Sequence, residues 1–414
     1  MSKLWKRTFH DDEKYISMVF DTYFDPELCA YRFNGDELVA GLIGVPYNFG
    51  NAERQIRGLY LCGLATDQRY RSQGIMTALL NEINEKAAQR GFAFTFLIPA
   101  DRGLRKYYAD RDYVSAFYRV VDNYTSLHDF NLDFESLLAD QKEKVAELKR
   151  RHYETLGTGI LKSDMPAYAE RREGIINLMI NIESVQEDLQ IIHSPRDIEV
   201  LIDENMLSGG EIHYTCTQSG EVVAVAFVTF DNTQANVVKL YATDQAAKYK
   251  VLGSIKRAHP ERGISHFVPS IEMDRKALWS RTYGSEMKPN SQVPEISVTE
   301  RVYSLAAHSK VYGMARILNL VEILKFQAEA RRDLNYSILV KTADKNNVEE
   351  IFVKGPNIRI KQIKTSELSA SQSAYLMSRR DVGEILFRRR DTDNLITEAF
   401  GIPSVNAAAS LLLD

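Results

Sequence analysis

The stretch LATDQRYRSQGIMTALLNEI, residues 64–83, leads from an apolar segment into a helix through two arginines and one glycine. The run LYLCGLA before the turn is continuously apolar, as is typical of a strand buried on both faces. Beyond the turn, apolar residues recur at helical spacing, and Gly91 supplies a C-terminal stop. The apolar stripe consists of Met76, Leu79, Leu80, Ile83 and Ala87. The stretch therefore predicts a strand, a tight basic loop and an amphipathic helix.

The flanking segments predict an alternation of helices and strands. A helix is expected over residues 11–24, strands over 37–49, 55–66 and 92–100, and a further helix from residue 103 that ends in a turn before 113. A strand, a helix and another strand in succession indicate a parallel pair of strands joined by a crossover. The expected fold class is therefore α+β, with mixed α/β character.

The composition limits the class of protein. A length of 414 residues suggests two or three domains, and 44% hydrophobic with 26% charged residues is typical of a globular protein. The net charge of −4 argues against a nucleic-acid or membrane partner, and no run of about 20 apolar residues or secretory signal occurs. Cys29, Cys62 and Cys216 lie far apart in the sequence, as suits a reducing compartment. A cytoplasmic location is expected.

Part of the pattern recurs later in the chain. The repeated segments keep their order: residues 220–228 resemble 35–45, and residues 241–258 resemble the opening stretch, both copies of which contain Ala-Thr-Asp-Gln. Two similar segments in the same order predict a duplicated fold. The copies differ at the loop, because Val251 stands where the first copy has Gly74. The second copy is expected to keep the scaffold and to have lost the turn.

The last part of the chain predicts a separate α+β domain. A long helix is expected over residues 309–330, short strands over 336–343, 349–355 and 357–363, and a second helix over 373–387. The apolar tail AAASLLLD, residues 407–414, is expected to be docked rather than exposed. Three domains are predicted, with boundaries at 1–128, 129–299 and 300–414.

The loop at residues 71–76 has the chemistry of a phosphate cradle. The first N–H groups of a helix have no intrahelical acceptor, and the helix dipole adds partial positive charge there. Gly74 lets a ligand approach the backbone without a Cβ in the way, which suits a pyrophosphate. Neighbouring cations that would neutralise it are Arg69, Arg71, Arg102, Arg105 and Lys106. A plain strand-to-helix corner that needs a glycine is the alternative interpretation.

Two motifs resemble those of the GCN5-related N-acetyltransferase (GNAT) superfamily. The family pattern V-D-P-x-Y-R-G-x-G-I-G is matched by T-D-Q-R-Y-R-S-Q-G-I-M, and F-Y-x-x-x-G-F is matched by Y-Y-A-D-R-D-Y at 107–113. Met76 replaces the final small residue of the first pattern. The resemblance implies direct transfer from acetyl-CoA to a primary amine, with N–H groups near 64–66 as donors to the oxyanion. The implied cofactor-binding residues are Leu64, Ala65, Thr66, Arg71, Ser72, Gln73, Gly74, Ile75, Met76, Thr77 and Tyr108.

The layout of the whole chain resembles the Eis (enhanced intracellular survival) acetyltransferases. In that family a degenerate second GNAT domain follows the first, and the third domain looks like a sterol carrier protein. The resemblance implies Tyr113 as general acid and the C-terminal carboxylate of Asp414 as general base, while Tyr108 matches the tyrosine of the wider superfamily and is the alternative acid. It also implies a homo-oligomer, and a hexamer in particular. No metal is expected, because the eight histidines show no metal-ligand spacing.

The acceptor amine is not determined by the sequence, and the resemblance suggests an aminoglycoside, a polyamine or lysine. Acidic residues near the N-terminus would suit a polycation, although a solvated helix face explains them equally well; they are Asp11, Asp12, Glu13, Asp21 and Asp25. Two other functions stay open. One is a catalytically silent protein that binds or senses CoA, and the other is lipid carriage by the last domain.

Overall fold

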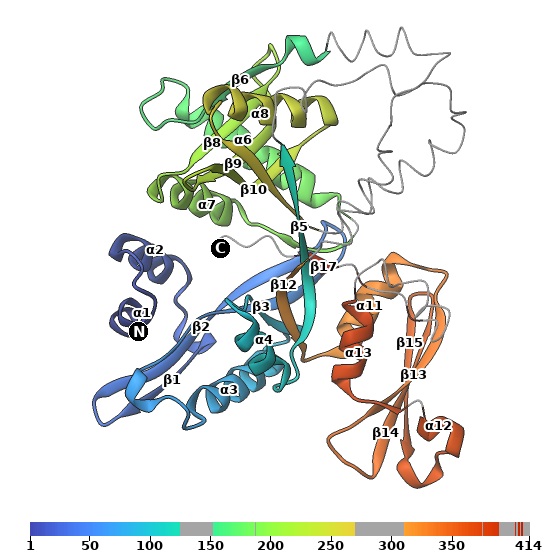
Figure 1. Cartoon of the computed structure of the whole chain (residues 1–414). Coiled ribbons are helices and arrows are strands. Elements are labelled where there is room, and N and C mark those ends of the chain that lie inside the picture. Colours follow the sequence, from blue (N-terminus) through green and yellow to red (C-terminus); the bar gives the residue numbers. More distant parts are fainter. Residues whose placement is uncertain are drawn as a thin grey trace, which may run out of the picture. The chain divides into compact units, whose positions relative to one another are not determined.

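The computed structural model describes residues 1–124, 152–186, 188–269, 310–374 and 376–388, together with residues 402, 405, 407 and 408. The chain divides into two compact units, whose elements are drawn in Figure 1. The first unit takes in residues 1–118, 187–191 and 310–409, and the second takes in residues 119–186, 192–309 and 410–414. Segments that lie far apart in the sequence therefore share a unit.

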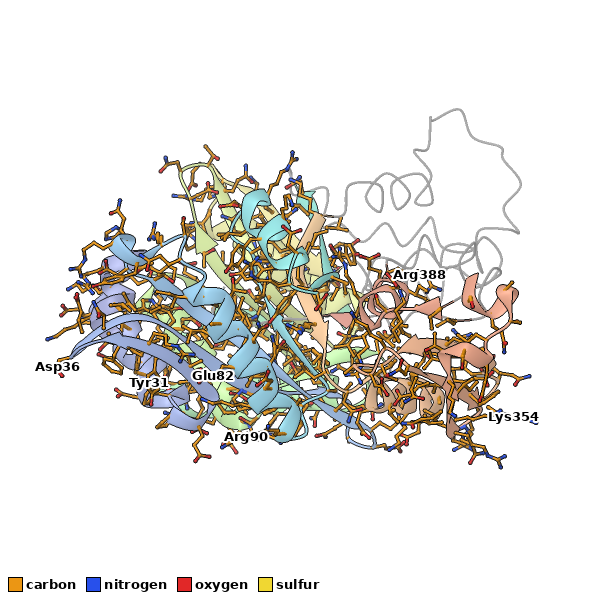
Figure 2. The ribbon with its side chains drawn as sticks, turned by 90° about the horizontal axis from the view of Figure 1, so that it is seen from below. Tyr31, Asp36, Glu82, Arg90, Lys354 and Arg388 are labelled. Carbon is orange, nitrogen blue, oxygen red and sulfur yellow. The ribbon has the colours of Figure 1, made fainter. Side chains whose placement is uncertain are left out.

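The first unit opens with two helices and a three-stranded antiparallel arrangement. Its N-terminal elements are α1 (Ser2–Phe9), α2 (Glu13–Tyr23), β1 (Cys29–Asn34), β2 (Glu37–Gly50), β3 (Gln55–Thr66), α3 (Ile75–Gln89), β4 (Phe94–Leu97), α4 (Arg102–Ala109) and β5 (Val114–Tyr124). Strand β3 pairs antiparallel with β2 and parallel with β4, and α3 forms the crossover. The predicted parallel crossover is confirmed. Figure 2 shows Asp36 at the tip of the β1–β2 hairpin, and Glu82 and Arg90 along α3.

Helix α3 packs its predicted stripe into the core of the first unit. Leu79, Leu80, Ile83 and Ala87 are fully buried in an apolar cluster with side chains of β1 to β4. The helix ends as predicted at Gly91, whose φ is 78°. The following N–H, at residue 92, donates to the carbonyl of residue 87, so the left-handed residue closes the last turn.

The predicted helix at 309–330 is wrong over its first half. Residues Lys310–Ile317 form strand β12, and helix α11 spans only Leu320–Ala330. Asn319 caps α11 by accepting a hydrogen bond from the N–H of Glu322 at 3.4 Å, which sets the start of the helix. Strand β12 pairs antiparallel with β4 and has β5 as its other neighbour. The apolar residues read as a helical face are thus partly the buried residues of a central strand.

The first unit also receives two short strands from elsewhere in the chain. Its strands run in the order β17 (Ala407–Ala408), β7 (Leu189–Ile192), β2, β3, β4, β12 and β5, with β1 on β2. Residues 189 and 190 of β7 pair in parallel with β17. Two later segments therefore complete the first repeat. Strand β7 begins at residue 189, more than 70 residues after residue 118, and β12 begins at residue 310, more than 190 residues after it.

A second, smaller sheet belongs to the last part of the chain. Its order is β15 (Asn357–Lys364), β14 (Asn347–Lys354), β13 (Asn335–Lys341) and β16 (Leu376–Met377). The three predicted strands are confirmed as an antiparallel meander, with Lys354 at the β14–β15 turn in Figure 2. The predicted helix over 373–387 is instead divided into α12 (Ala370–Ala374), β16 and α13 (Arg379–Leu386). Ser378 explains the break, because it forms a capping box with Asp381 and starts α13 anew.

The second unit repeats the topology of the first. Its elements are β6 (Gly157–Ile160), α6 (Tyr168–Ser184), α7 (Pro195–Leu207), β8 (Glu211–Cys216), β9 (Val222–Phe230), β10 (Gln234–Ala242), α8 (Gln245–Ala258) and β11 (Gly263–Pro269). Strand β10 pairs antiparallel with β9 and parallel with β11, as β3 does with β2 and β4. Residues 119–124 of β5 pair antiparallel with β11. The predicted duplication of the fold is confirmed by this shared topology.

The two repeats differ at the strand-to-helix junction, as predicted. Helix α8 is capped by Asp244, whose side chain accepts a hydrogen bond from the N–H of Ala247 at 2.8 Å. The helix therefore starts almost directly after β10 and absorbs the residues that form a loop in the first repeat. Val251, the counterpart of Gly74, lies inside α8 and is fully buried.

No helix in the described parts of the chain is long and apolar enough to span a membrane.

Candidate functional site

The loop before α3 presents unpaired backbone donors at the surface. Gly74 caps the helix with a φ of 78°, and Ser72 two residues earlier has a φ of 61°. The first intrahelical bond runs from the Ala78 N–H to the Gly74 carbonyl at 3.1 Å, so the N–H groups of Ile75, Met76 and Thr77 have no acceptor within the helix. A Cβ on Gly74 would meet no atom within 4 Å. Open space over free donors fits the pyrophosphate of acetyl-CoA, which these groups would hold.

Arg69 and Arg71 contribute differently from each other. Arg69 pairs with the carboxylates of Asp67 and Glu37, and its Nε lies 3.0 Å from Asp67 Oδ1. Its hydrogen bonds hold the pKa of Asp67 at about 2, so the charge of Arg69 is balanced within the protein. The Nε of Arg71 donates to the Thr66 carbonyl at 3.1 Å, which ties the loop to the end of β3. Of the two, Arg71 is the cation with no carboxylate partner among the described residues.

Met76 has a packing role that the sequence did not reveal. Met76 and Ile75 are half-buried and pack against the apolar cluster under α3. A small residue would leave part of that cluster uncovered, because the side chain reaches the core rather than the open face of the loop. The departure from the family pattern at this position is therefore compatible with an open cradle.

The segment after α4 is joined to the first turn of α3 by Arg111, a residue that the motifs did not single out. Arg111 donates from Nε and Nη2 to the hydroxyl of Thr77 at 3.0 and 2.7 Å, and its guanidinium lies 3.5 Å from the centre of the Tyr107 ring. The Tyr107 hydroxyl lies 3.3 Å from the same Thr77 oxygen. Tyr107 and Arg111 are four residues apart within the tyrosine motif, and residues at that spacing are neighbours on a helical turn. This spacing was the signal in the sequence that could have indicated their contact. This contact brings the predicted loop and the predicted tyrosine segment together.

The two candidate tyrosines lie side by side but have different surroundings. Their ring centres are 5.8 Å apart in an edge-to-face arrangement. Tyr113 is fully buried, and its hydroxyl lies 3.1 Å from Thr95 Oγ1 and 3.4 Å from Asn84 Oδ1. Tyr108 is 7% exposed, and no hydrogen bond of its hydroxyl to another described residue is found. Burial raises the pKa of both phenols, so both keep their proton near neutral pH.

The turn before Tyr113 adopts the conformation that the family motif implies. Asp112, at the position of the motif glycine, has a φ of 65°. Ser72 likewise occupies a motif glycine position with a positive φ. Aspartate enters the left-handed region more readily than most residues, because its short polar side chain can hydrogen-bond locally. The backbone path is thus retained at both positions without the glycine.

Strand β3 opens beyond its midpoint. Its parallel pairing with β4 is found only for residues 58–60 with residues 94–96 in the described structure, although β3 continues to residue 66. Opposite β2, a bulge at Gly63 and Leu64 interrupts the register, and Gly63 has a φ of 59°. Ala65 and Thr66 resume the pairing with β2. In the described structure, the end of β3 is thus paired with β2 on one edge and not paired with β4 on the other, which leaves backbone donors there for a ligand.

The other predicted groups are placed as follows. Arg102 and Lys106 are exposed, and Lys106 pairs with Asp110 at 2.9 Å. Arg105 is half-buried, and its Nε is buried without a hydrogen-bond partner. Asp414 lies outside the described residues, as does most of the apolar tail. The structure therefore brings together the loop, Tyr108 and Tyr113. The predicted base, Asp414, is not among the described residues.

Three of the acidic residues near the N-terminus, Asp11, Asp12 and Asp25, have local structural partners. Asp11 accepts from the Trp5 indole at 2.6 Å, Asp12 caps α2 through the Lys14 N–H, and Asp25 caps the next turn through the Glu27 N–H. A carboxylate that caps a helix stabilises that helix whether or not a substrate is present. These contacts favour the structural interpretation of the acidic bias over an acceptor site.

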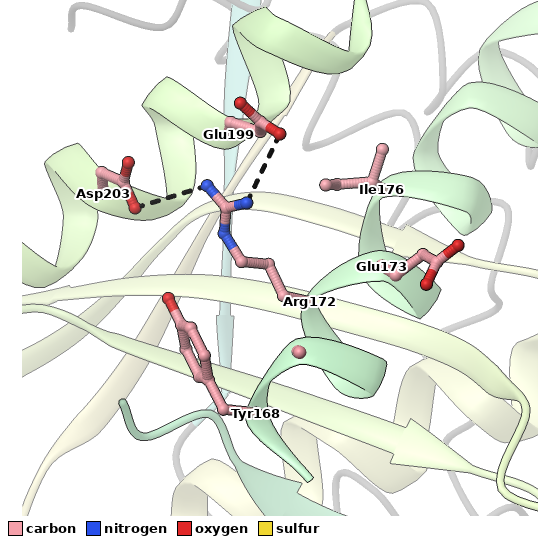
Figure 3. A pocket seen from close by; sticks show the side chains of 7 residues that line it. Tyr168, Arg172, Glu173, Ile176, Glu199 and Asp203 are labelled. Carbon is pink, nitrogen blue, oxygen red and sulfur yellow. Dashed lines mark ion pairs between the residues drawn. The ribbon is translucent and has the colours of Figure 1, made fainter. Parts of the chain in front are cut away.

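A surface pocket in the second unit lies between α6 and α7 and is shown in Figure 3. Arg172 crosses it and pairs with Glu199 at 3.4 Å and with Asp203 at 3.6 Å. Tyr168, Glu173 and Ile176 also line the pocket, and no predicted site residue does. Because its central cation is already paired, the pocket is a compensated charge cluster on a helix pair.

The strands β2, β3 and β4, the helix α3 and the donor-rich loop at its start all lie within residues 1–114. These residues match the family model described as acetyltransferase (GNAT) domain. No curated protein sequence matches the chain.

Several solved structures share the fold over almost the whole chain. A probable N-acyltransferase from Enterococcus faecalis V583, itself described as a conserved protein of unknown function, aligns with a TM-score of 0.60 at 11% identity, covering 97% of this chain and 93% of that one. A GCN5-related N-acetyltransferase from Anabaena variabilis gives 0.61 at 12% identity, over 94% and 87%. Eis1 from Mycobacterium abscessus gives 0.57 at 12% identity, over 99% and 93%. The similarity supports the mixed α/β tandem architecture.

Proposed function

We propose that this chain is an acetyl-CoA-dependent N-acetyltransferase that acetylates a primary amine by direct transfer. The observation that carries the proposal is the loop and the first turn of α3, residues 71–77, where free N–H groups and a left-handed Gly74 face open space beside the two buried tyrosines. The second repeat has the same scaffold without this loop, so the loop is not a requirement of the fold. The first repeat is therefore the one we assign to catalysis.

The transfer requires three groups in addition to the cradle. A base takes a proton from the ammonium, so that the nitrogen lone pair can attack the thioester carbonyl. Donors on the open edge of β3 near residues 64–66 stabilise the oxyanion. The C–S bond then breaks, and an acid gives its proton to the thiolate of CoA. Asp414 as base stays a prediction of the family resemblance.

For the acid, the surroundings of the hydroxyls favour Tyr108 over Tyr113. The Tyr113 hydroxyl is engaged by Thr95 and Asn84 inside the core, whereas no such contact is found for Tyr108 among the described residues. A proton donor has to reach the leaving group within hydrogen-bond distance. We therefore propose Tyr108 as the acid and Tyr113 as the residue that positions it through their ring contact.

A pair of matched variants tests this assignment. Tyr108→Phe should lower kcat by roughly 10²-fold or more, because it removes the proton donor, and should leave CoA binding unchanged. Tyr113→Phe removes a hydroxyl of the same kind from the adjacent ring and should lower kcat by less than about tenfold. Release of free thiol from acetyl-CoA is measured with a panel of aminoglycosides, polyamines and lysine peptides. The opposite ranking would return the acid to Tyr113, and no turnover with any amine despite CoA binding would contradict the enzyme assignment.

Finer features of the resemblance belong to the same proposal. We propose an Eis-like enzyme with a sterol-carrier-like last domain, which forms a homo-oligomer, and a hexamer in particular, in the cytoplasm. The likeness to Eis1 over nearly the full chain supports the family assignment. In the last domain, apolar side chains of β13 and β14 are buried with α11, which supports a packed scaffold rather than a lipid carrier. Met76 packs against the core, so its difference from the family pattern gives no support to a catalytically silent CoA-binding protein.

A further inference from the structure

Three potential metal ligands meet in the second unit, far in sequence from the proposed transfer site. Glu211 and His213 lie on β8 with a spacing of two, so their side chains project from the same face of the strand. His259 is the C-cap residue of α8. The ligand atoms of the three residues all lie within 4.8 Å of one another.

The geometry of the three side chains converges on one oxygen. Oε2 of Glu211 lies 2.9 Å from Nε2 of His213 and 2.9 Å from Nε2 of His259. A tetrahedral zinc ion with bonds of about 2.0–2.1 Å keeps its ligand atoms about 3.3 Å apart. Small rotations of the three side chains would therefore open the space for an ion, without movement of either backbone element.

The cluster is enclosed on one side and accessible on the other. The side chain of His213 is 1% exposed, whereas those of His259 and Glu211 are 21% and 30% exposed. The ring of His259 packs on Phe230, with ring centres 4.7 Å apart, which holds it in place. An ion can thus enter from the side of Glu211 and His259, and a water can complete its coordination there.

Ser254 lies beside the other ring nitrogen of His213. The Ser254 hydroxyl donates to the Val251 carbonyl at 2.7 Å, and its oxygen lies 3.2 Å from Nδ1 of His213, where it can accept a hydrogen bond. Nε2 of His213 faces the carboxylate of Glu211 at 2.9 Å. With a proton on Nδ1, the lone pair of Nε2 is available to an ion beside that carboxylate.

We propose that Glu211, His213 and His259 bind one divalent transition-metal ion, for which Zn²⁺ is the best match. Two imidazole nitrogens and one carboxylate oxygen are a ligand set that zinc accepts, with water in the fourth position. The Ser254 oxygen, 3.2 Å from Nδ1 of His213, would accept the outer hydrogen bond that fixes a metal-binding imidazole. The ion would join β8 to the end of α8 and so stabilise the second unit. The inference is independent of the proposed acetyl transfer.

Zinc binding by the full chain tests the proposal. Tag-free protein is stripped with a chelator, dialysed and titrated with Zn²⁺ by calorimetry, and its Tm is measured with and without the metal. We expect one ion per chain and a higher Tm with zinc, as for any ligand that binds the folded state. Co²⁺ in place of zinc should give the visible absorption of a four-coordinate site.

Matched variants identify the ligands. His259→Ala, at the exposed side of the cluster, and Glu211→Gln should each weaken zinc binding by roughly tenfold or more and remove the cobalt spectrum. His152→Ala is the control, since His152 is an exposed histidine 3.3 Å from Asp244 in the same unit. Circular dichroism checks that each variant is folded, and the two ligand variants are independent of each other. Absence of stoichiometric zinc binding, or equal affinity in His259→Ala, Glu211→Gln and the control, would overturn the proposal and leave a hydrogen-bonded His–Glu–His cluster.

Discussion

At the scale of single residues, the conformation of Gly74 separates a functional glycine from a structural one. Gly74 and Gly91 stand at opposite ends of α3, each with a φ of 78°, and a Cβ on either would meet nothing within 4 Å. The two positions therefore impose the same backbone strain on an L-residue. Only the first lies at the helix end where the backbone donors are free.

This pair gives a controlled prediction. Gly74→Ala and Gly91→Ala should each lower the free energy of unfolding by about 1–2 kcal/mol, because both place an L-residue in the left-handed region. Only Gly74→Ala should also weaken CoA binding, by roughly tenfold or more, because its Cβ occupies the space of the phosphates. Denaturant unfolding and calorimetric titration with CoA measure the two effects. Equal loss of CoA affinity in both variants would show that strain, and not the cradle, is responsible.

At the scale of elements, a buried carboxylate links α6 to the segment before α7. Glu183 is 2% exposed and accepts hydrogen bonds from the His193 N–H and from the Tyr241 hydroxyl, both at 2.7 Å. The ring Nδ1 of His193 lies 2.7 Å from Oε1 of Glu183, the oxygen that also accepts the hydrogen bond from Tyr241. Burial alone would raise the pKa of Glu183, but the charge and hydrogen bonds of His193 and the bond from Tyr241 outweigh it, so the pKa is lowered.

The lowered pKa predicts a pH dependence of stability with a defined sign. The unfolded chain binds a proton at Glu183 at a higher pH than the folded chain does, so the contribution of this carboxylate is complete above the unfolded pKa of about 4.3 and is lost as the pH falls through the folded pKa. Glu183→Gln should lower the free energy of unfolding by about 1–3 kcal/mol near neutral pH and flatten its loss in acid.

Denaturant unfolding from neutral to acidic pH measures this effect. Glu170→Gln on the same helix is the control, since Glu170 is exposed and its one ion pair among the described residues is with Arg171 across 3.3 Å. Exposed pairs contribute about 0–1 kcal/mol, so this variant should follow the wild-type profile. Parallel profiles for wild type and Glu183→Gln would mean that the buried carboxylate does not set the acid limit.

At the scale of the whole molecule, the first repeat depends on a strand from the last third of the chain. Residues Met314 to Ile317 of β12 pair with β4, and the N–H groups of Leu318 and Asn319 both approach the Ala93 carbonyl at 2.9 Å. Ala315 in the middle of this strand is fully buried. Residues 1–114, which match the acetyltransferase (GNAT) family model, therefore do not contain every strand of their sheet.

A proline in β12 tests this dependence. Ala315→Pro should destabilise the first unit by about 3 kcal/mol or more, because a central strand loses a ladder hydrogen bond and its packing. CoA binding should fall with it, although Ala315 lies outside the loop. Lys345→Pro is the matched control, since Lys345 is exposed in the turn between β13 and β14. Unaltered stability and CoA binding in Ala315→Pro would contradict the role of β12.

Local pattern was sufficient for the parts of the fold that local physics determines. The stripe of α3, the stop at Gly91, the apolar strand β3 and the meander of β13 to β15 each depend on periodicity or on one residue's backbone freedom. The duplication was predictable because both copies keep their similar segments in the same order. The loss of the loop in the second copy was predictable because Val251 replaces Gly74. The loop of the candidate site was predictable for the same reason.

The sequence by itself thus determined the duplicated α/β scaffold and the loop that suits a phosphate, because these follow from spacing along a continuous segment. Only the tertiary structure decided the features that depend on pairing between segments distant in the sequence. Strand β12 has the apolar content of a helix and becomes a strand because β4 and β5 offer it hydrogen bonds. Arg111 on Thr77, the buried hydroxyl of Tyr113 and the cluster of Glu211, His213 and His259 arise in the same way. Their partners are distant along the chain, and only folding brings them within reach.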